Sequence, residues 1–283
     1  MVVDKPAGIT SQGLVGKVRK RFNERQVGHA GTLDPDATGV MLIGVGRATR
    51  LLTFLVGMDK TYTGTIKFGA RTSTLDAAGE VVERFDMTPP AIADVRAVIA
   101  ANLMGEILQI PPMVSAIQVD GKRLHQLARE GVEIERQPRP VRVDRFDVEP
   151  TEDPMSFSFV VDCASGTYIR SLADDLGRLL GGGAYLNTLR RTRVNGFKVE
   201  DARSVDDAEL QPPLAAIPHL LQVVVSDDES ARVLHGAVLE SDSRFAGDGP
   251  WAVCDGRNEL LAVYERYRAD AVKPSVVIAQ SGE

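Results

Sequence analysis

The alternation of apolar and polar residues predicts short strands and amphipathic helices along most of the chain. Residues 61–68 alternate with a period of two and place Tyr62, Ile66 and Phe68 on one face, which is typical of a half-buried strand. Residues 157–163 alternate in the same way and predict a second strand, whereas the continuous apolar run over 40–45 predicts a buried strand. Apolar spacing near 3.6 residues predicts three helices, whose apolar positions span 14–22, 92–103 and 169–180. Thr10 or Ser11 is placed to cap the first of these helices.

A loop joins the expected strand over 157–163 to the expected helix over 169–180. Tyr168 and Arg170 lie at this junction, where side chains can point into a cleft. From the residues alone, Arg170 is either a surface arginine or the ion-pair partner of Asp174.

After residue 204 the sequence predicts a connector followed by a smaller, separate part of the chain. Residues 211–225 form a proline-marked apolar connector, and beyond it Asp227 or Asp228 is expected to cap a short helix. The expected packing residues of that helix are Ala231, Leu234 and Val238. Asp255-Gly256 between two apolar runs predicts a β-hairpin.

The composition is that of an ordinary globular protein. Of the 283 residues, 43% are hydrophobic and 25% are charged. No apolar run approaches the roughly 20 residues of a spanning helix, and the start lacks a basic-then-apolar signal pattern, so we expect a cytoplasmic protein without a membrane segment. Cys163 and Cys254 lack metal-ligand spacing and are expected to be buried thiols.

The net charge of −6 is unevenly distributed. Residues 1–204 carry 27 Lys and Arg against 25 Asp and Glu, whereas residues 205–283 carry 6 against 14. The larger, N-terminal part is therefore locally basic, which is compatible with binding RNA phosphates. A basic cluster along the first expected helix is either a solvated face or a phosphate-contacting patch; it comprises Lys17, Arg19, Lys20, Arg21 and Arg25.

Candidate chemistry is concentrated in residues 28–39, GHAGTLDPDATG. This stretch holds His29, three glycines and Asp34, and Pro35 biases Asp34 away from helical geometry. Taken alone, an Asp-Pro pair beside glycine is more often a turn or cap than a catalytic group.

These residues carry a resemblance to a known family. GHAGTLDPDATG, followed by VMLI and GRATR, resembles the active-site motif of the TruB family of tRNA pseudouridine-55 synthases. Further matches are Lys60-Thr61-Tyr62, RTSTLDAAG at 71–79, SGTYIRSL at 165–172 with the following DDLG, and YLNTLRRTR at 185–193. The resemblance covers residues 2 to about 204 well and the remainder more loosely.

The resemblance implies an α+β protein with a pseudouridine-synthase fold. Its mixed, mainly antiparallel sheet is expected to be flanked by helices, with a small β-rich PUA-like domain at the C-terminus. The implied domains are a catalytic domain over 1–210, with a thumb-like insertion at about 111–140, and a PUA-like domain over 225–283. The C-terminal part is short and acidic, which argues against strong RNA binding by it.

The resemblance also implies the reaction, the isomerisation of uridine-55 in the T-loop of tRNA after the base has been flipped out. The catalytic residues would be Asp34 as nucleophile, Arg170 as its counter-ion and Tyr62 stacked on the base. From its pattern alone Tyr62 is a core aromatic. Substrate-binding roles are expected for His29, Tyr168, Leu189, Asp76 and Lys5.

No cofactor or metal is expected, since the isomerisation neither gains nor loses atoms and the chain shows no phosphate loop or zinc ligand set. The expected partner is the T-arm hairpin of tRNA, bound by a monomer without a protein partner. Two alternatives stay open: a tRNA-binding folding chaperone with secondary or lost catalysis, and a related synthase that acts on another RNA.

Overall fold

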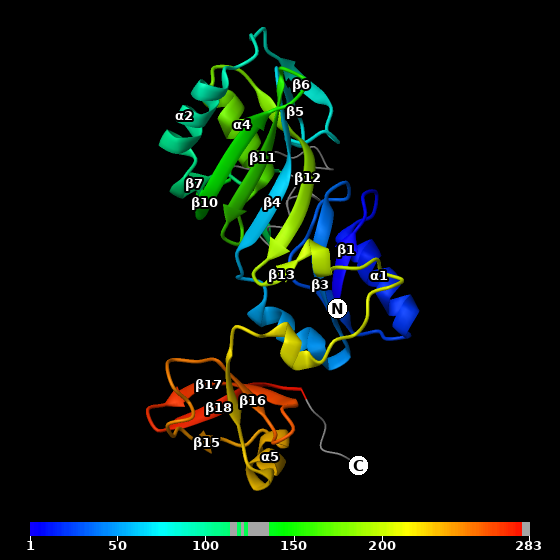
Figure 1. The fold of residues 1–283 in the computed structure, drawn as a ribbon, viewed down its shortest axis with the longest axis vertical. Coiled ribbons are helices and arrows are strands. Elements are labelled where there is room, and N and C mark those ends of the chain that lie inside the picture. Colours follow the sequence, from blue (N-terminus) through cyan, green and yellow to red (C-terminus); the bar gives the residue numbers. More distant parts are fainter. Residues whose placement is uncertain (114–117, 120–121, 124–135, 279–283) are drawn as a thin grey trace.

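A computed structural model describes residues 1–113, 118–119, 122–123 and 136–278. The helices are α1 (Ser11–Phe22), α2 (Ile92–Asn102), α4 (Ile169–Leu179) and α5 (Asp227–Leu234), with 3-10 helices η1 (Gly46–Phe54), η2 (Val199–Asp201) and η3 (Pro213–Ala216). These elements form two lobes, each built on its own sheet (Figure 1).

The larger sheet occupies the N-terminal lobe. Its main path runs through β1 (Val2–Lys5), β3 (Thr38–Val45), β12 (Ala184–Val194), β4 (Lys60–Phe68), β11 (Ser156–Cys163), β10 (Arg139–Pro150) and β7 (Gly105–Gln109). Two short strands pair at its side, β2 (Val27–His29) with β3 and β13 (Phe197–Lys198) with β12. Only the β3–β12 pairing is parallel among these strands, so the sheet is mixed and mainly antiparallel, as predicted.

The expected alternation in β4 is present. Tyr62, Ile66 and Phe68 are all buried in one core cluster. Residues of α2 and α4, including Val95, Ile99, Leu172 and Leu176, complete that cluster and cover one face of the sheet. These helices begin and end within a few residues of the predicted ranges because their apolar spacing reflects the face they bury.

Gly39 explains how β3 comes close enough to β12 to pair with it. Its φ is +109°, and a Cβ at this position would lie 2.1 Å from the Arg191 carbonyl oxygen. Any other residue would therefore push the two strands apart. This contact fixes the loop just before β3 against the centre of the sheet.

Helix α1 lies beside that loop. Thr10 caps it, with its side chain accepting from Gly13 N at 2.9 Å. Two members of its basic cluster bond backbone carbonyls, Arg19 to Val27 and Arg21 to Val205 and Ala208. The exposed remainder of the cluster is Lys17, Lys20 and Arg25.

The C-terminal lobe holds a five-stranded sheet. Its strand order is β14 (Leu221–Val224), β16 (Trp251–Cys254), β17 (Leu260–Arg268), β18 (Ala271–Val277) and β15 (Leu239–Glu240). The predicted hairpin at Asp255-Gly256 joins β16 to β17. Strand β14 lies within the stretch that was expected to be a connector.

Helix α5 corrects two sequence-based expectations. Its N-cap is Ser226, one residue before the predicted aspartates, and Ser226 forms a capping box with Glu229. Its buried residue is Val233, and the predicted Leu234 is half-buried against the same cluster, whereas Ala231 and Val238 are exposed. An eight-residue helix offers too few turns for its apolar spacing to identify the buried face.

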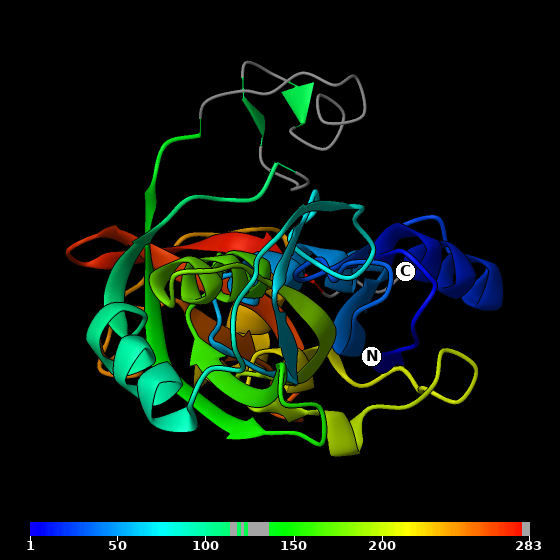
Figure 2. The same cartoon turned by 90° about the horizontal axis from the view of Figure 1, so that it is seen from above.

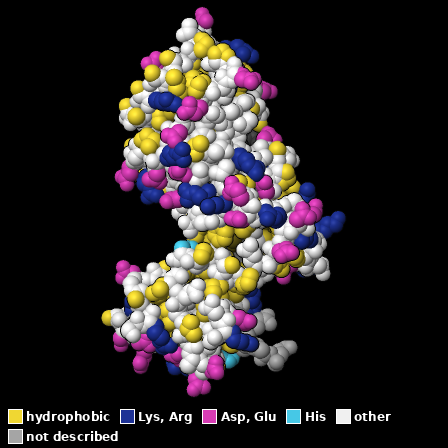
Figure 3. All heavy atoms as spheres, viewed as in Figure 1, with side chains coloured by type: hydrophobic (Ala, Val, Ile, Leu, Met, Phe, Trp, Pro, Cys, Tyr) yellow, Lys and Arg dark blue, Asp and Glu magenta, His cyan; other side chains and the backbone are white. Residues whose placement is uncertain are grey.

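A shared apolar cluster joins the two lobes. Val40, Leu42 and Leu51 from the N-terminal lobe pack with Ala252 and Val263 of the second sheet. Hydrophobic side chains are visible at the narrow waist between the lobes (Figure 3). The lobes therefore share part of one core.

Two two-stranded sheets complete the described structure. One pairs β5 (Ala70–Thr72) with β6 (Val81–Arg84), and the other pairs β8 (Gln118–Val119) with β9 (Lys122–Arg123). Strands β8 and β9 project from the body of the molecule (Figure 2). Most of the predicted thumb at 111–140 lies outside the described residues. In the described part of the chain, no helix has the length and apolarity needed to cross a membrane.

Candidate active site

The loop between β2 and β3 carries Asp34 and is held by contacts on both sides of it. Ser11 Oγ lies 2.9 Å from both the backbone N and O of Leu33. On the other side, Lys5 Nζ donates to Pro35 O at 2.7 Å and Gly8 N donates to the same oxygen at 3.0 Å. The position of Asp34 is thus fixed by its two chain neighbours.

Arg170 at the start of α4 faces Asp34 and binds it through two contacts. Arg170 Nε lies 3.0 Å from Asp34 Oδ2, and Arg170 Nη2 donates to Asp34 Oδ1 at 3.2 Å. The Arg170 side chain is 6% exposed and that of Asp34 is 36% exposed. The guanidinium is therefore fixed inside the protein, while the carboxylate opens to the outside.

Asp76 lies on the other side of Arg170. Its Oδ2 is 3.7 Å from Arg170 Nε, and Arg170 Nη1 donates to Thr74 O at 3.1 Å. Asp76 Oδ1 also accepts from Ala78 N at 3.1 Å, closing the turn between β5 and β6. Asp76 therefore both closes a turn and holds the arginine.

The electrostatics of Asp34 combine opposing effects. Burial is the largest and raises the pKa of Asp34 above its ordinary value, while Arg170 and Lys5 lower it; Asp76 and Asp36 raise it further. The net pKa is raised because desolvation of the carboxylate exceeds the attraction of its two cationic neighbours.

A cavity of about 270 Å³ opens beside Asp34. Five predicted site residues line it together: Asp34, Tyr62, Tyr168, Arg170 and Leu189. A groove of about 630 Å³ meets this cavity at Asp34 and Leu189 and contains Asp76 in its wall. A planar ring in the smaller cavity would lie beside the carboxylate, while an extended chain would follow the groove.

Tyr62 belongs to both the core and the cavity wall. It is 8% exposed, and its hydroxyl is hydrogen-bonded to Arg191. Burial raises the pKa of the Tyr62 phenol and Arg191 opposes this rise. A core position for Tyr62 and a place beside a base in the cavity, the two interpretations from sequence, are therefore compatible.

The two remaining predicted residues lie outside both cavities. Lys5 is fully buried below the Asp34 loop, where its Nζ bonds the carbonyl oxygens of Pro6 and Pro35. His29 is partly buried and has Gln12 Nε2 3.5 Å from its Nε2. Burial and Arg191 lower the pKa of His29.

Three residues of the site had no role in the sequence-based prediction. Gln109 is buried and binds the backbone of Tyr168 in both directions, with Nε2 to O at 3.0 Å and N to Oε1 at 2.8 Å. Lys60 and Arg191 line the smaller cavity. Both lie within the matched motifs, which was the available signal, whereas nothing in the sequence singled out Gln109.

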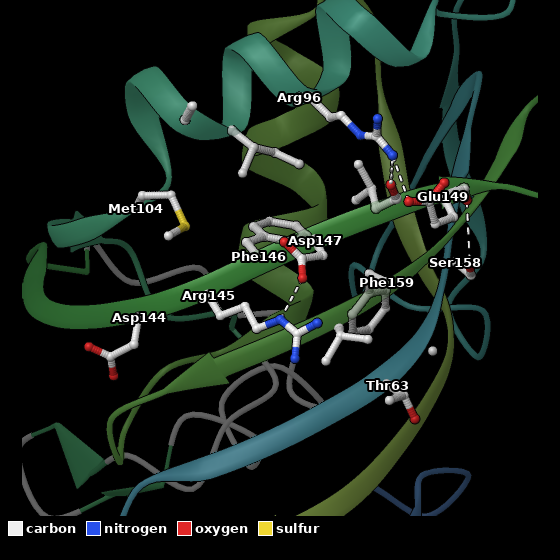
Figure 4. A pocket seen from close by; sticks show the side chains of 15 residues that line it. Thr63, Arg96, Met104, Asp144, Arg145, Phe146, Asp147, Glu149, Ser158 and Phe159 are labelled. Carbon is white, nitrogen blue, oxygen red and sulfur yellow. Dashed lines mark hydrogen bonds and ion pairs between the residues drawn. The ribbon is translucent and has the colours of Figure 1, made fainter.

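The largest of these three cavities, of about 860 Å³, lies elsewhere, between α2 and the strands β10 and β11. Four of its charged groups form two ion pairs, Arg96 with Glu149 and Arg145 with Asp147 (Figure 4). Asp34 does not line it. The described residues contain no group of three His, Cys, Asp or Glu side chains placed to hold a metal ion.

Comparison with known families decides the classification. Residues 19–169 match the N-terminal domain of the TruB family of pseudouridylate synthases, and residues 170–223 match the C-terminal domain of tRNA pseudouridylate synthase B. The chain belongs to the TruB family of pseudouridylate synthases. The resemblance noted in the motifs is thereby confirmed, as is the enzyme class.

Curated relatives support this membership over nearly the whole chain. A Mycobacterium tuberculosis protein named tRNA pseudouridine synthase B is 42% identical over 271 residues, covering 93% of this chain and 90% of the relative. An Arthrobacter protein of the same name is 41% identical over 302 residues, covering 100% and 97%. One from Mycobacteroides abscessus is 48% identical over 211 residues, covering 73% and 70%.

Solved structures support the fold. A chain from a Cbf5–Nop10–Gar1 complex matches with a TM-score of 0.72 and 27% identity, covering 99% of this chain and 85% of that chain. A chain from an H/ACA ribonucleoprotein bound to a substrate RNA matches with a TM-score of 0.71 and 24% identity, covering 98% and 84%. The predicted α+β pseudouridine-synthase fold with a C-terminal β-rich part is confirmed.

Proposed function

We propose that this TruB-family enzyme converts uridine-55 in the T-loop of tRNA to pseudouridine, with Asp34 as the nucleophile. The observation that carries the proposal is the Asp34 carboxylate, held by two contacts from Arg170 at the mouth of a cavity lined by Tyr62 and Leu189. The names of the curated relatives support tRNA as the substrate.

The chemistry requires a carboxylate that can attach and leave. The N1–C1′ bond of uridine breaks, the base turns, and C5 joins C1′ without any gain or loss of atoms. Asp34 provides the attacking oxygen, as carboxylates do at glycosidic bonds. Arg170 orients the carboxylate and opposes the rise in its pKa that burial causes.

The remaining cavity residues bind the flipped base. Extrusion of a base costs roughly a few kcal/mol of stacking, part of which is recovered by contacts in the cavity. Tyr62 stacks on the ring, Leu189 contacts its other side, and Tyr168 bonds the base or its sugar. His29 fills the space that the base leaves in the RNA.

Two predicted residues act on the site from its edges. Asp76 holds Arg170 and forms part of the groove, which we assign to the T-arm strand. Lys5 acts beneath the loop by fixing Pro35. The predicted domain division, with catalysis in 1–210 and a PUA-like domain in 225–283, is retained in this proposal, as is a cytoplasmic monomer that needs no cofactor.

The direct test is to map pseudouridine in tRNA transcripts treated with the purified chain and no added cofactor. We expect modification at uridine-55. Asp34→Asn is expected to fold, bind tRNA and form no pseudouridine, because the amide lacks the nucleophilic anion. Asp147→Asn is the matched control, since Asp147 lies in the largest cavity, away from Asp34.

Normal conversion by Asp34→Asn would contradict the assignment of the nucleophile. Loss of conversion in Asp147→Asn alone would move the site to the largest cavity. If the unaltered chain bound tRNA tightly and left every uridine unchanged, the folding chaperone would be the better description.

A further inference from the structure

Two buried cations form one wall of the uridine cavity beside Tyr62. Arg191 is fully buried, Lys60 is 6% exposed, and both line the 270 Å³ cavity. Neither forms an ion pair with a carboxylate in the part of the chain that the structure describes; their hydrogen bonds go to neutral groups. This wall of the cavity therefore carries positive charge that no ion pair among the described residues neutralises.

Arg191 binds three backbone carbonyls around the Asp34 loop. Its Nε donates to Val40 O at 2.8 Å, its Nη2 to Gly31 O at 3.2 Å and its Nη1 to Thr32 O at 3.5 Å. It also hydrogen-bonds the Tyr62 hydroxyl. Carbonyl and hydroxyl dipoles satisfy the guanidinium N–H groups but do not cancel its charge.

Lys60 converges on the same point. Its Nζ donates to Met58 O at 2.6 Å and to Val56 O at 3.4 Å. A Cβ on Gly31 would lie 3.4 Å from Arg191 Nη1 and 3.6 Å from Lys60 Cε. The two side chains therefore meet behind one glycine of the Asp34 loop.

This arrangement is unfavourable in the free protein. Burial is the main cause that lowers the pKa of Lys60 to about 8, and the like charge of Arg191 lowers it further. Cys163 on β11 and Asp59 just before β4 partly oppose this effect. Strongly perturbed groups that line a cavity point to a functional role, here the binding of negative charge.

The proposed reaction generates such a charge inside the cavity. An Asp34 oxygen bonds to C1′ as the N1–C1′ bond breaks, and both electrons of the broken bond stay with the base, which becomes a uracil anion with charge on N1, O2 and O4. When an electron pair of this anion forms the C5–C1′ bond, the Asp34–C1′ bond breaks and returns the carboxylate. C5 then loses its proton and N1 gains one. Atoms and charge therefore balance without any co-reactant.

We propose that Lys60 and Arg191 stabilise the uracil anion while the base is detached from the ribose. This inference rests on the proposed function and adds a second electrostatic element to it. Arg170 supports the nucleophile, while Lys60 and Arg191 support the leaving group from the side of Tyr62. Fixed cations in a water-excluded cavity stabilise a developing anion more strongly than water does.

The test measures single-turnover conversion and tRNA affinity between pH 6 and 10. The unaltered enzyme is expected to slow by roughly tenfold per pH unit above about 8, where Lys60 loses its proton. Lys60→Arg should keep its rate through pH ~10, because arginine stays protonated. Ionisation of uracil N3 occurs equally in both enzymes, so their difference isolates residue 60.

Lys60→Met is expected to slow conversion by about 100-fold at pH 7. Its tRNA dissociation constant should stay within about twofold of the unaltered enzyme. Lys67→Met is the matched control, because Lys67 lies at the far end of β4 and pairs with Asp153 on the surface. A thermal unfolding curve for each variant separates loss of folding from loss of rate.

Three results would overturn the inference. One is a normal rate for folded Lys60→Met. Another is a conversion rate that falls above pH ~8 in the same way for Lys60→Arg and for the unaltered enzyme. The third is a loss of tRNA affinity as large as the loss of rate, which would mean that the cation binds a phosphate in the ground state. Failure of the proposed function looks different, because the unaltered enzyme would then form no pseudouridine at all.

Discussion

At the scale of single residues, Arg170 determines how the site is built. It contacts Asp34, Asp76 and Thr74 O, which come from two separate loops. Asp174, the partner considered from sequence, binds Arg71 at 2.8 Å and Arg178 at 3.5 Å instead. The planar fork of an arginine binds a carboxylate through two contacts and still reaches further acceptors, whereas a lysine lacks this planar fork.

Tyr62→Phe tests the role of the phenol. The variant keeps the ring but loses the hydroxyl that bonds Arg191, so we expect single-turnover conversion to fall by about 100-fold while tRNA affinity changes little. Tyr185→Phe on β12 is the control. Equal losses of rate and affinity in Tyr62→Phe would argue against a role confined to the cavity.

The choice of Asp34, Tyr62 and Arg170 as candidate site residues was predictable because long motifs contain them. Their proximity was not, since the three lie in separate elements that only the folded sheet brings together. Lys60 and Arg191 lie in the same motifs, yet a sequence gives no sign that a cation is buried without a carboxylate. The role of Gln109 could not be predicted, because only the packing of β7 beside α4 brings it to the backbone of Tyr168.

At the scale of elements, the predicted strands and main helices agree with the structure because most of them bury one regular face, while β3, a continuous apolar run, is buried on both faces. Helix α5 is too short for its apolar spacing to predict its buried face. It has one buried residue, Val233, and its start depends on the capping box of Ser226 and Glu229. Glu229 also pairs with Arg244 at 2.7 Å.

Ser226→Ala is expected to lower stability by about 1 kcal/mol, because it removes the side-chain cap of α5.

Hydrogen bonds from Arg244 are the main cause that lowers the pKa of Glu229 to about 2. Because its folded pKa lies below its unfolded value, Glu229 stabilises the fold above pH ~4.5 and loses this effect as the pH falls toward 2.

Urea unfolding curves at pH 7 and pH 3 would measure both effects. Ser243→Ala serves as the control, because Ser243 is an exposed serine in the same lobe. An unchanged unfolding midpoint for Ser226→Ala at pH 7 would show that the cap contributes nothing to α5.

At the scale of the whole molecule, the shared apolar cluster couples the two lobes. Ile217, in the connection between them, is fully buried in this cluster. The sequence predicted a small β-rich part, but not how it docks, because the residues of the interface alternate like any other core positions. For the same reason, the sequence did not predict that the second sheet begins at β14.

Ile217→Ala should therefore destabilise both lobes together, by about 2–5 kcal/mol. Unfolding can be followed by the fluorescence of Trp251, the only tryptophan, which lies in the second sheet, and by loss of pseudouridine formation. The two transitions should coincide. Leu210→Ala, at an exposed position nearby, is the control, and separated transitions in Ile217→Ala would show that the lobes unfold independently.

The two cysteines add a practical consequence. Cys163 lies in β11 and Cys254 in β16, so each sheet contains one thiol, and burial raises the pKa of both to about 11. Alkylating reagents attack the thiolate, so in the closed native state both sulfurs are inert at neutral pH. The two native cysteines therefore serve as probes without added mutations. The order in which mass spectrometry detects labelled Cys163 and Cys254 reports which sheet opens first and exposes its thiol.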